Sequence, residues 1–159
     1  MGTINKTIEQ INLLADGIYG GIHQHDNATS QSIPTGVTYT KLTEWADNDS
    51  FNNTVPDQSA SEITLTYAGD YKIESQLSFA SGTNNTTMFV SAFLDGVELD
   101  ECHFTRKISV ADDIGSASFT GIVTVTAGQV LDLRIRHDDV GSVAITVQYG
   151  TINATLVAL

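Results

Sequence analysis

The stretch GIVTVTAGQVLDLRIRH, residues 121–137, decides the fold class. It contains two runs of alternating apolar and polar residues, separated by the small residues of a turn at 127–129. Leu131, Leu133 and Ile135 have the same parity, so in an extended chain they point to one face. An apolar residue at every second position predicts a strand with one buried face, and two such runs around a short turn predict a hairpin.

The same period of two continues along most of the chain. Ile73, Leu77 and Phe79 share a parity, and Asp95-Gly96 is a strong signal for a two-residue hairpin. The expected strands are 37–45, 61–66, 71–79, 86–96, 97–110, 117–126, 129–137, 142–150 and 151–159, after a first strand that begins near residue 19. Pro34 and Pro56 are expected in loops. This spacing of short strands and turns predicts an all-β jelly-roll β-sandwich over residues 19–159.

The first 18 residues have a different period. Apolar residues follow one another at spacings of four and three, which is typical of an amphipathic helix or a short coiled coil. Fewer than three heptads are too short for a stable isolated helix, so the segment is either a helix with a partner or an arm that orders on docking. We expect residues 1–18 to anchor or oligomerise the protein, with these contact residues: Ile4, Ile8, Ile11, Leu14 and Ile18.

Composition excludes several classes of protein. The 159 residues carry a net charge of −12, and the seven basic residues are scattered, so no nucleic-acid or anionic membrane surface is expected. The N-terminus has no basic region followed by an apolar one, which predicts that the chain folds in a cytoplasm. The single cysteine, Cys102, excludes a disulfide scaffold and is expected to be a buried thiol.

Catalytic motifs are missing from the sequence. GxSxG and GxGxxG do not occur, and no carboxylate pair is marked by an apolar pocket signal. His103 directly follows Cys102, so the two side chains are expected on opposite faces of a strand. We therefore predict that the protein is not an enzyme and needs no cofactor.

His23 and His25 lie two residues apart, and both imidazoles face one side if the segment is a strand. They are a candidate metal site, with Asp26 or Asp16 as an oxygen donor, although a pair gives only two of the three or four ligands that zinc needs. The alternative is that both are surface residues of the first strand. The acidic pairs 112–113 and 138–139, and the loop that carries Asp47, Asp49 and Asp57, are either calcium-binding loops or, as we expect, solvated loop tips.

Five segments, taken in order, resemble the C1q/TNF-like jelly rolls of tailed-phage virion proteins. They are YGGIH (19–23), YTKL (39–42) with Trp45 shortly after, AGDYKI (68–73), FVSAFLDGV (89–97) and GIVTVTAGQVLDL (121–133). The chain ends YGTINATLVAL instead of the aromatic-rich Phe-x-Gly-x-Leu strand of the animal C1q proteins. This departure favours the phage group over the animal one.

The resemblance implies a homotrimer whose protomers pack flat sheets around a three-fold axis. It also implies a non-enzymatic virion protein, a capsid decoration, cement or head-fibre protein on the surface of the head. Such a protein would assemble in the host cytoplasm and bind the major capsid protein, or another virion protein, through its N-terminal segment. The alternative is a receptor- or carbohydrate-binding module of a tail or fibre, in which Tyr39, Trp45 and Tyr149 would stack on sugars.

Overall fold

The computed structural model describes residue 12 and residues 17–159, so the predicted N-terminal helix or arm lies almost entirely outside the described residues. The described part contains strands β1 (Tyr19–Gln24), β2 (Gln31–Ile33), β3 (Thr40–Lys41), β4 (Asp47–Asn48), β5 (Thr54–Asp57), β6 (Glu62–Leu65), β7 (Gly69–Ser81), β8 (Thr86–Leu94), β9 (Val97–Ile108), β10 (Ile114–Val125), β11 (Gln129–His137) and β12 (Val143–Ala158). No helix in this part of the chain is long and apolar enough to cross a membrane.

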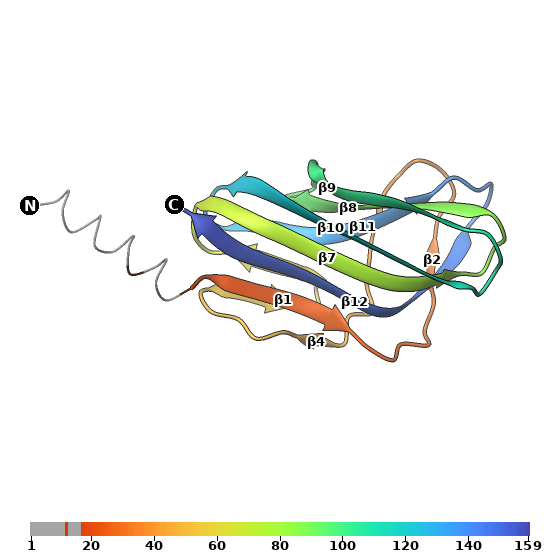
Figure 1. Cartoon of the computed structure of the whole chain (residues 1–159), viewed down its shortest axis with the longest axis horizontal. Helices are drawn as coiled ribbons and strands as arrows, with labels where there is room; N and C mark the ends of the chain where they lie inside the picture. Colours follow the sequence, from red (N-terminus) through yellow and green to blue (C-terminus); the bar gives the residue numbers. More distant parts are fainter. Residues whose placement is uncertain (1–11, 13–16) are drawn as a thin grey trace, which may run out of the picture.

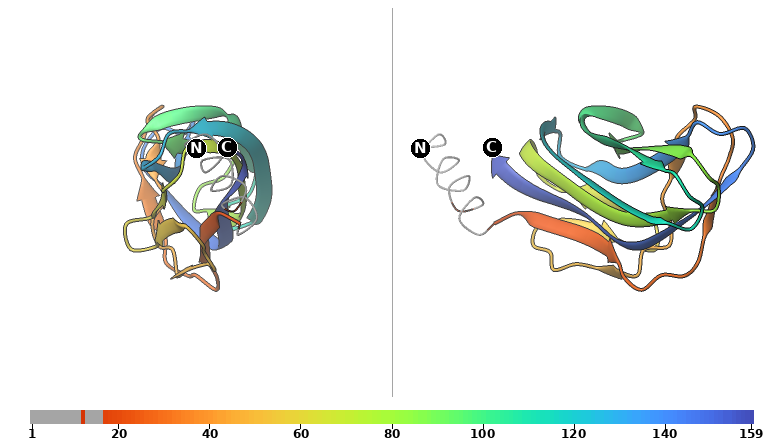
Figure 2. Two further views of the ribbon diagram at one scale, coloured as in Figure 1. Left: turned by 90° about the vertical axis from the view of Figure 1, so that its left-hand side faces the viewer. Right: turned by 45° about the vertical axis from the view of Figure 1, so that its right-hand side comes forward.

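The strands form two antiparallel sheets that pack face to face (Figure 1). The first sheet has the order β10-β7-β12-β1-β4, with β2 added to β12, and is called the β7–β12 sheet below. The second has the order β5-β6-β11-β8-β9, with β3 added to β11. The end-on view in Figure 2 shows the strands arranged around a central space, which the core side chains fill. The predicted jelly-roll β-sandwich is confirmed.

The core follows from the alternation in the sequence. On β7, Tyr71, Ile73 and Phe79 are completely buried, and on β11 Leu131 and Ile135 are completely buried. These residues have the parity that the sequence indicates, and they point between the two sheets. The turn at Asp95 and Gly96 has positive φ at both positions, 49° and 80°, as a tight type I′ hairpin requires, so this prediction is also confirmed.

The predicted boundary between strands 142–150 and 151–159 is wrong, because β12 is one continuous strand. Its pairing with β7 shifts register between Val147 and Tyr149, which is a β-bulge. The bulge reverses the parity, so Val147 and Ile152 both point inward although one is odd and the other even. Gly150 is needed within the strand, since a Cβ there would lie 2.6 Å from Cδ2 of Leu77.

Two other strand predictions need correction. Of the expected strand 37–45 only Thr40–Lys41 is β-structure, because residues 42–46 leave the second sheet and lead to β4 of the first, with Leu42 and Trp45 buried on the way. Pro56 lies in β5 instead of a loop. It is tolerated there because β5 is an edge strand that pairs only with β6, so a missing N–H breaks no second ladder.

Candidate functional site

The outer face of the β7–β12 sheet is the candidate functional surface. Cross-strand pairing places Ser118 opposite Gln76, Gln76 opposite Thr151, Thr151 opposite His23, and His23 opposite Asp47. These side chains share one face, so a polar row crosses all five strands from β10 to β4. The face is wide because β7, β10 and β12 are long strands.

This face is hollowed. One open cavity of about 820 Å³ is lined by residues of β1, β7, β10 and β12, among them Gln76, Ser118 and Tyr149. A second hollow of about 520 Å³ shares Gln76, Ser118 and Thr151 with the first, so the two are continuous. Most of the lining residues are uncharged: serine, threonine, glutamine and asparagine, which are polar, and glycine.

The centre of the face carries little charge, although the protein has a net charge of −12. Glu74 lines the second hollow, and its carboxylate pairs with the ammonium group of Lys72 at 2.8 Å. Asp70, further along β7, accepts a hydrogen bond of 2.7 Å from the Thr124 hydroxyl. The other side chains that point outward from β7, β10 and β12 are uncharged. The ionisable groups of this face gather at the β1–β4 edge.

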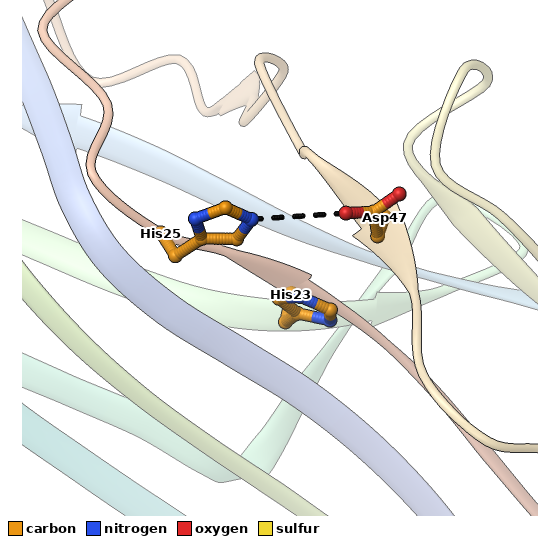
Figure 3. A group of neighbouring side chains, drawn as sticks. All are labelled: His23, His25 and Asp47. Atoms are coloured by element: carbon orange, nitrogen blue, oxygen red, sulfur yellow. Dashed lines mark ion pairs between the residues drawn. The ribbon is translucent and has the colours of Figure 1, made fainter.

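A cluster of histidines and carboxylates forms that edge. His23 and His25 from β1 and its end lie beside Asp47 of β4, and their ligand atoms are all within 4.8 Å of one another. Nε2 of His25 lies 3.7 Å from Oδ2 of Asp47, and the two imidazole rings are stacked with centroids 5.5 Å apart (Figure 3). We call His23, His25 and Asp47 the histidine cluster. The sequence-predicted pair is thus brought together with a carboxylate.

Two further carboxylates lie on the outer side of the imidazoles. Oδ1 of Asp49 lies 2.8 Å from Nδ1 of His23, and Oδ2 of Asp26 lies 3.9 Å from Nδ1 of His25. Nδ1 of His23 is buried and makes no hydrogen bond, so Asp49 is its close neighbour without being a hydrogen-bond partner. Asp26 was expected to supply a ligand oxygen, but it faces Nδ1 of His25, and the carboxylate grouped with the two imidazoles is that of Asp47. Asp16, the other expected donor, lies outside the described residues.

The sequence marked Asp47 and Asp49 only as part of an acidic loop, and their place beside the histidines was missed. They are brought to the histidines by two backbone hydrogen bonds of 2.9 Å, from Ala46 N to His23 O and from Asp49 N to Gly21 O. A signal was present, because the two aspartates are two residues apart, the same spacing as the two histidines. Two such pairs on neighbouring strands face each other only if the strands are paired, which the sequence did not show.

Of the three candidate sugar-stacking aromatics, only Tyr149 lies at the hollow. Its ring is 51% exposed, and its hydroxyl donates a hydrogen bond to Asp26, which raises the pKa of Tyr149. Trp45 is only 8% exposed, and its indole Nε1 donates to the Leu42 carbonyl at 3.1 Å, so the expectation that it stacks on sugars is wrong.

Tyr39 lies far from Tyr149 in the fold, on the outer side of the second sheet. Its ring packs against Phe93, with centroids 5.1 Å apart, and the Arg136 guanidinium lies 5.2 Å above it. Burial, followed by hydrogen bonding to Glu98, raises the pKa of Tyr39. The three aromatics therefore form no common platform.

Ile18 also differs from its expected role. It is 1% exposed and belongs to the hydrophobic core, and its carbonyl accepts a hydrogen bond of 2.8 Å from Leu156 N. Its side chain is therefore not available to a partner of the folded protomer. The other expected contacts, Ile4, Ile8, Ile11 and Leu14, lie outside the described residues.

Cys102 is buried and His103 is exposed, which confirms that they lie on opposite faces of β9. Burial, with a smaller effect of Glu101, raises the pKa of the Cys102 thiol to about 11, so the thiolate is disfavoured at neutral pH. The acidic pair at 138–139 is not simply a solvated tip, because Asp138 accepts a hydrogen bond from Thr87 N at 2.9 Å and Asp139 accepts one from the Thr86 hydroxyl. The pair fixes the start of β8.

No family model matches the sequence, and no curated protein is similar to it. Solved structures are similar in fold. The Eiger TNF from S. frugiperda aligns with a TM-score of 0.59 and 11% identity, over 89% of this chain and 94% of that one. The globular domain of the zebrafish complement 1qA protein aligns with a TM-score of 0.60 and 13% identity, over 88% and 97%. The chain therefore has a C1q/TNF-like jelly-roll fold.

Proposed function

We propose that the protein is a non-enzymatic, homotrimeric structural protein of a virion, a decoration, cement or head-fibre protein on the head surface. In this proposal the protomers associate through the outer face of the β7–β12 sheet. The N-terminal segment attaches the trimer to the major capsid protein or to another virion protein. The observation that carries the association is the hollowed, nearly uncharged centre of this face on a strongly acidic molecule.

The composition of this face favours burial against protein. The centres of protein interfaces are depleted of charged residues and enriched in tyrosine, and an acidic surface elsewhere keeps free protomers soluble. Tyr19, Ile122 and Tyr149 are on this face and between 40% and 60% exposed. Small side chains around the hollow permit close approach of a second backbone. A neighbouring protomer is the occupant that best fits these properties.

The position of the chain ends supports an anchoring role for the first residues. Tyr19 pairs with Thr155, so the start of β1 and the end of β12 lie at one end of the sandwich (Figure 1). Three segments preceding Gly17 would then leave a trimer from the same end. Three weak contacts to a regular shell strengthen one another through effective concentration.

The virion role itself rests on the sequence resemblance to phage jelly rolls. The experiment that tests it has two parts, mass and particle binding. We expect multi-angle light scattering to give a trimer for the full chain. A chain lacking residues 1–16 separates the sandwich from its anchor and leaves the buried Ile18 in place. It should remain a trimer and lose its affinity for shells assembled from the candidate major capsid protein.

A substitution in the face makes the test of association sharper. Ser118→Arg places three added charges in the proposed contact and should give a smaller particle that is still folded. Thr105→Arg, at an exposed position on β9 of the other sheet, is the matched control and should leave the mass unchanged. A full-length chain that remains a folded monomer and binds no shell would rule out the proposal.

The second candidate is a carbohydrate-binding module of a tail or fibre. Tyr149 is exposed at the lip of the hollow, beside Asp26 and near hydroxyl and amide side chains that could accept and donate hydrogen bonds to a sugar. Binding of the full chain to an immobilised glycan, lost in Tyr149→Ala, would favour this function. The same substitution separates the two candidates. If Tyr149 lies in the trimer interface, Tyr149→Ala should lower the mass of the particle. If Tyr149 belongs to a sugar site, Tyr149→Ala should remain a trimer and lose only its binding to the glycan.

A further inference from the structure

We propose that the histidine cluster binds a divalent transition-metal ion, with zinc as the metal that its chemistry favours. Two imidazole nitrogens and one carboxylate oxygen form the donor set, which is common at zinc sites with three protein ligands. Calcium and magnesium prefer sites made of oxygen alone, so they are disfavoured here. The three donors come from one chain, so the site needs no second protomer, although His23 also lines the hollow of the proposed contact face.

The separation of the donor atoms fits one ion. Ligands placed about 2.0–2.2 Å from zinc in a tetrahedron lie about 3.4 Å apart. Nε2 of His25 and Oδ2 of Asp47 are 3.7 Å apart, and all three donors lie within 4.8 Å of one another. His25 and Asp47 are exposed side chains at the edge of the sheet, so small rotations bring their donors to the shorter distance.

The backbone holds the donors in place before any metal arrives. His23 and Asp47 are a cross-strand pair of β1 and β4, and hydrogen bonds on both sides of the pair fix the register. His25 follows at the spacing that returns a side chain to the same face. Little ordering of the chain is therefore needed on binding.

The outer carboxylates are an independent indication of a metal site. Asp49 contacts Nδ1 of His23 at 2.8 Å, and Asp26 lies 3.9 Å from Nδ1 of His25. Imidazoles that bind a metal through one nitrogen usually place the other against a carboxylate, which orients the ring and makes it a better donor. Coordination through Nε2 of both histidines would use this arrangement in full. It also gives a role to the buried Nδ1 of His23, which otherwise lacks a hydrogen bond.

Calorimetric titration of the EDTA-treated full chain with ZnCl₂ tests the proposal. We expect one zinc ion per chain, and no binding of CaCl₂ or MgCl₂ at the same concentrations. Asp49→Asn should weaken zinc binding by about 10- to 100-fold, the usual effect of removing an outer carboxylate. His25→Ala and Asp47→Asn remove ligands and should weaken it further. His103→Ala and Asp113→Asn change exposed residues elsewhere and should bind zinc as the unaltered chain does.

Imidazole NMR of the same samples provides a readout that does not depend on affinity. Zinc should shift the ring signals of His23 and His25 and leave those of His103 and His137 in place. Circular dichroism of the variants checks that each remains folded, which the exposure of His25 and Asp47 favours. The proposal is overturned if zinc does not bind at millimolar concentration. It is also overturned if His25→Ala binds as well as the unaltered chain, or if His103→Ala loses binding equally.

Discussion

Ile18→Ala tests whether the sandwich begins before β1. The side chain is 1% exposed. The substitution removes three buried methyl or methylene groups, each worth about 0.8 kcal/mol of transfer free energy, or about 2.4 kcal/mol together. A cavity adds to this, and buried isoleucine-to-alanine changes cost about 2–5 kcal/mol. Ile18 precedes the first strand, where the chain can partly close the space. We therefore expect the free energy of unfolding to fall by about 3 kcal/mol.

Urea unfolding followed by tryptophan fluorescence measures this loss. With an m-value of about 2 kcal/mol/M, the midpoint should fall by about 1.5 M and the slope should not change. Both proteins are compared at one concentration, because association would make the midpoint depend on it. Val140→Ala, at a fully exposed position, is the control and should change the stability by less than about 0.5 kcal/mol. The assignment of Ile18 to the core would be refuted by a loss as small as the control's, together with a smaller particle mass.

Three further predictions concern two buried groups, the Cys102 thiol and the Asp132 carboxylate. The Cys102 thiol should resist Ellman's reagent at pH 8 in the folded protein and react quickly in urea; equal rates would contradict its burial. Its pKa is raised to about 11 in the folded state from about 9 when unfolded, so the folded chain holds the proton more tightly between these values. The free energy of unfolding should therefore fall as the pH rises from 9 to 11. Over this range Cys102→Ala should lose less stability than the unaltered chain. Arg134→Ala should cost about 2 kcal/mol in urea unfolding, because it leaves the nearly buried Asp132 carboxylate without hydrogen bonds of 2.6 and 2.8 Å. If Arg134→Ala loses no more stability than the exposed Arg106→Ala, then Lys41, which lies 3.7 Å from Asp132, is enough to stabilise the Asp132 carboxylate.

Local patterns predicted much of the fold. The alternation at Ile73, Leu77 and Phe79 assigns these residues to the core face through the geometry of a single strand. The Asp95-Gly96 turn depends on two adjacent residues that adopt positive φ, and it lies where the sequence places it. A jelly roll follows because many half-buried strands need to cover one another.

The course of the C-terminal strand could not be predicted from neighbouring residues alone. The change of parity near Gly150 has two explanations, a turn between two strands or a bulge within one. β7 and β1 lie on either side of β12 and supply partners along its length, so the chain continues as a strand through the bulge. The same applies to Trp45, whose burial depends on the loop that carries it and not on its own residue type.

The candidate metal site also has one part that the sequence predicts and one part that depends on the tertiary structure. The sequence by itself determined that His23 and His25 share a face, because two residues of one strand are always so related. Only the tertiary structure decided that Asp47 and Asp49 lie against them. Those residues are more than 20 positions further along the chain, and their approach depends on β4 pairing with the free edge of β1. Periodicity is a property of neighbouring residues, whereas the partners of a strand are chosen by the packing of the whole sandwich.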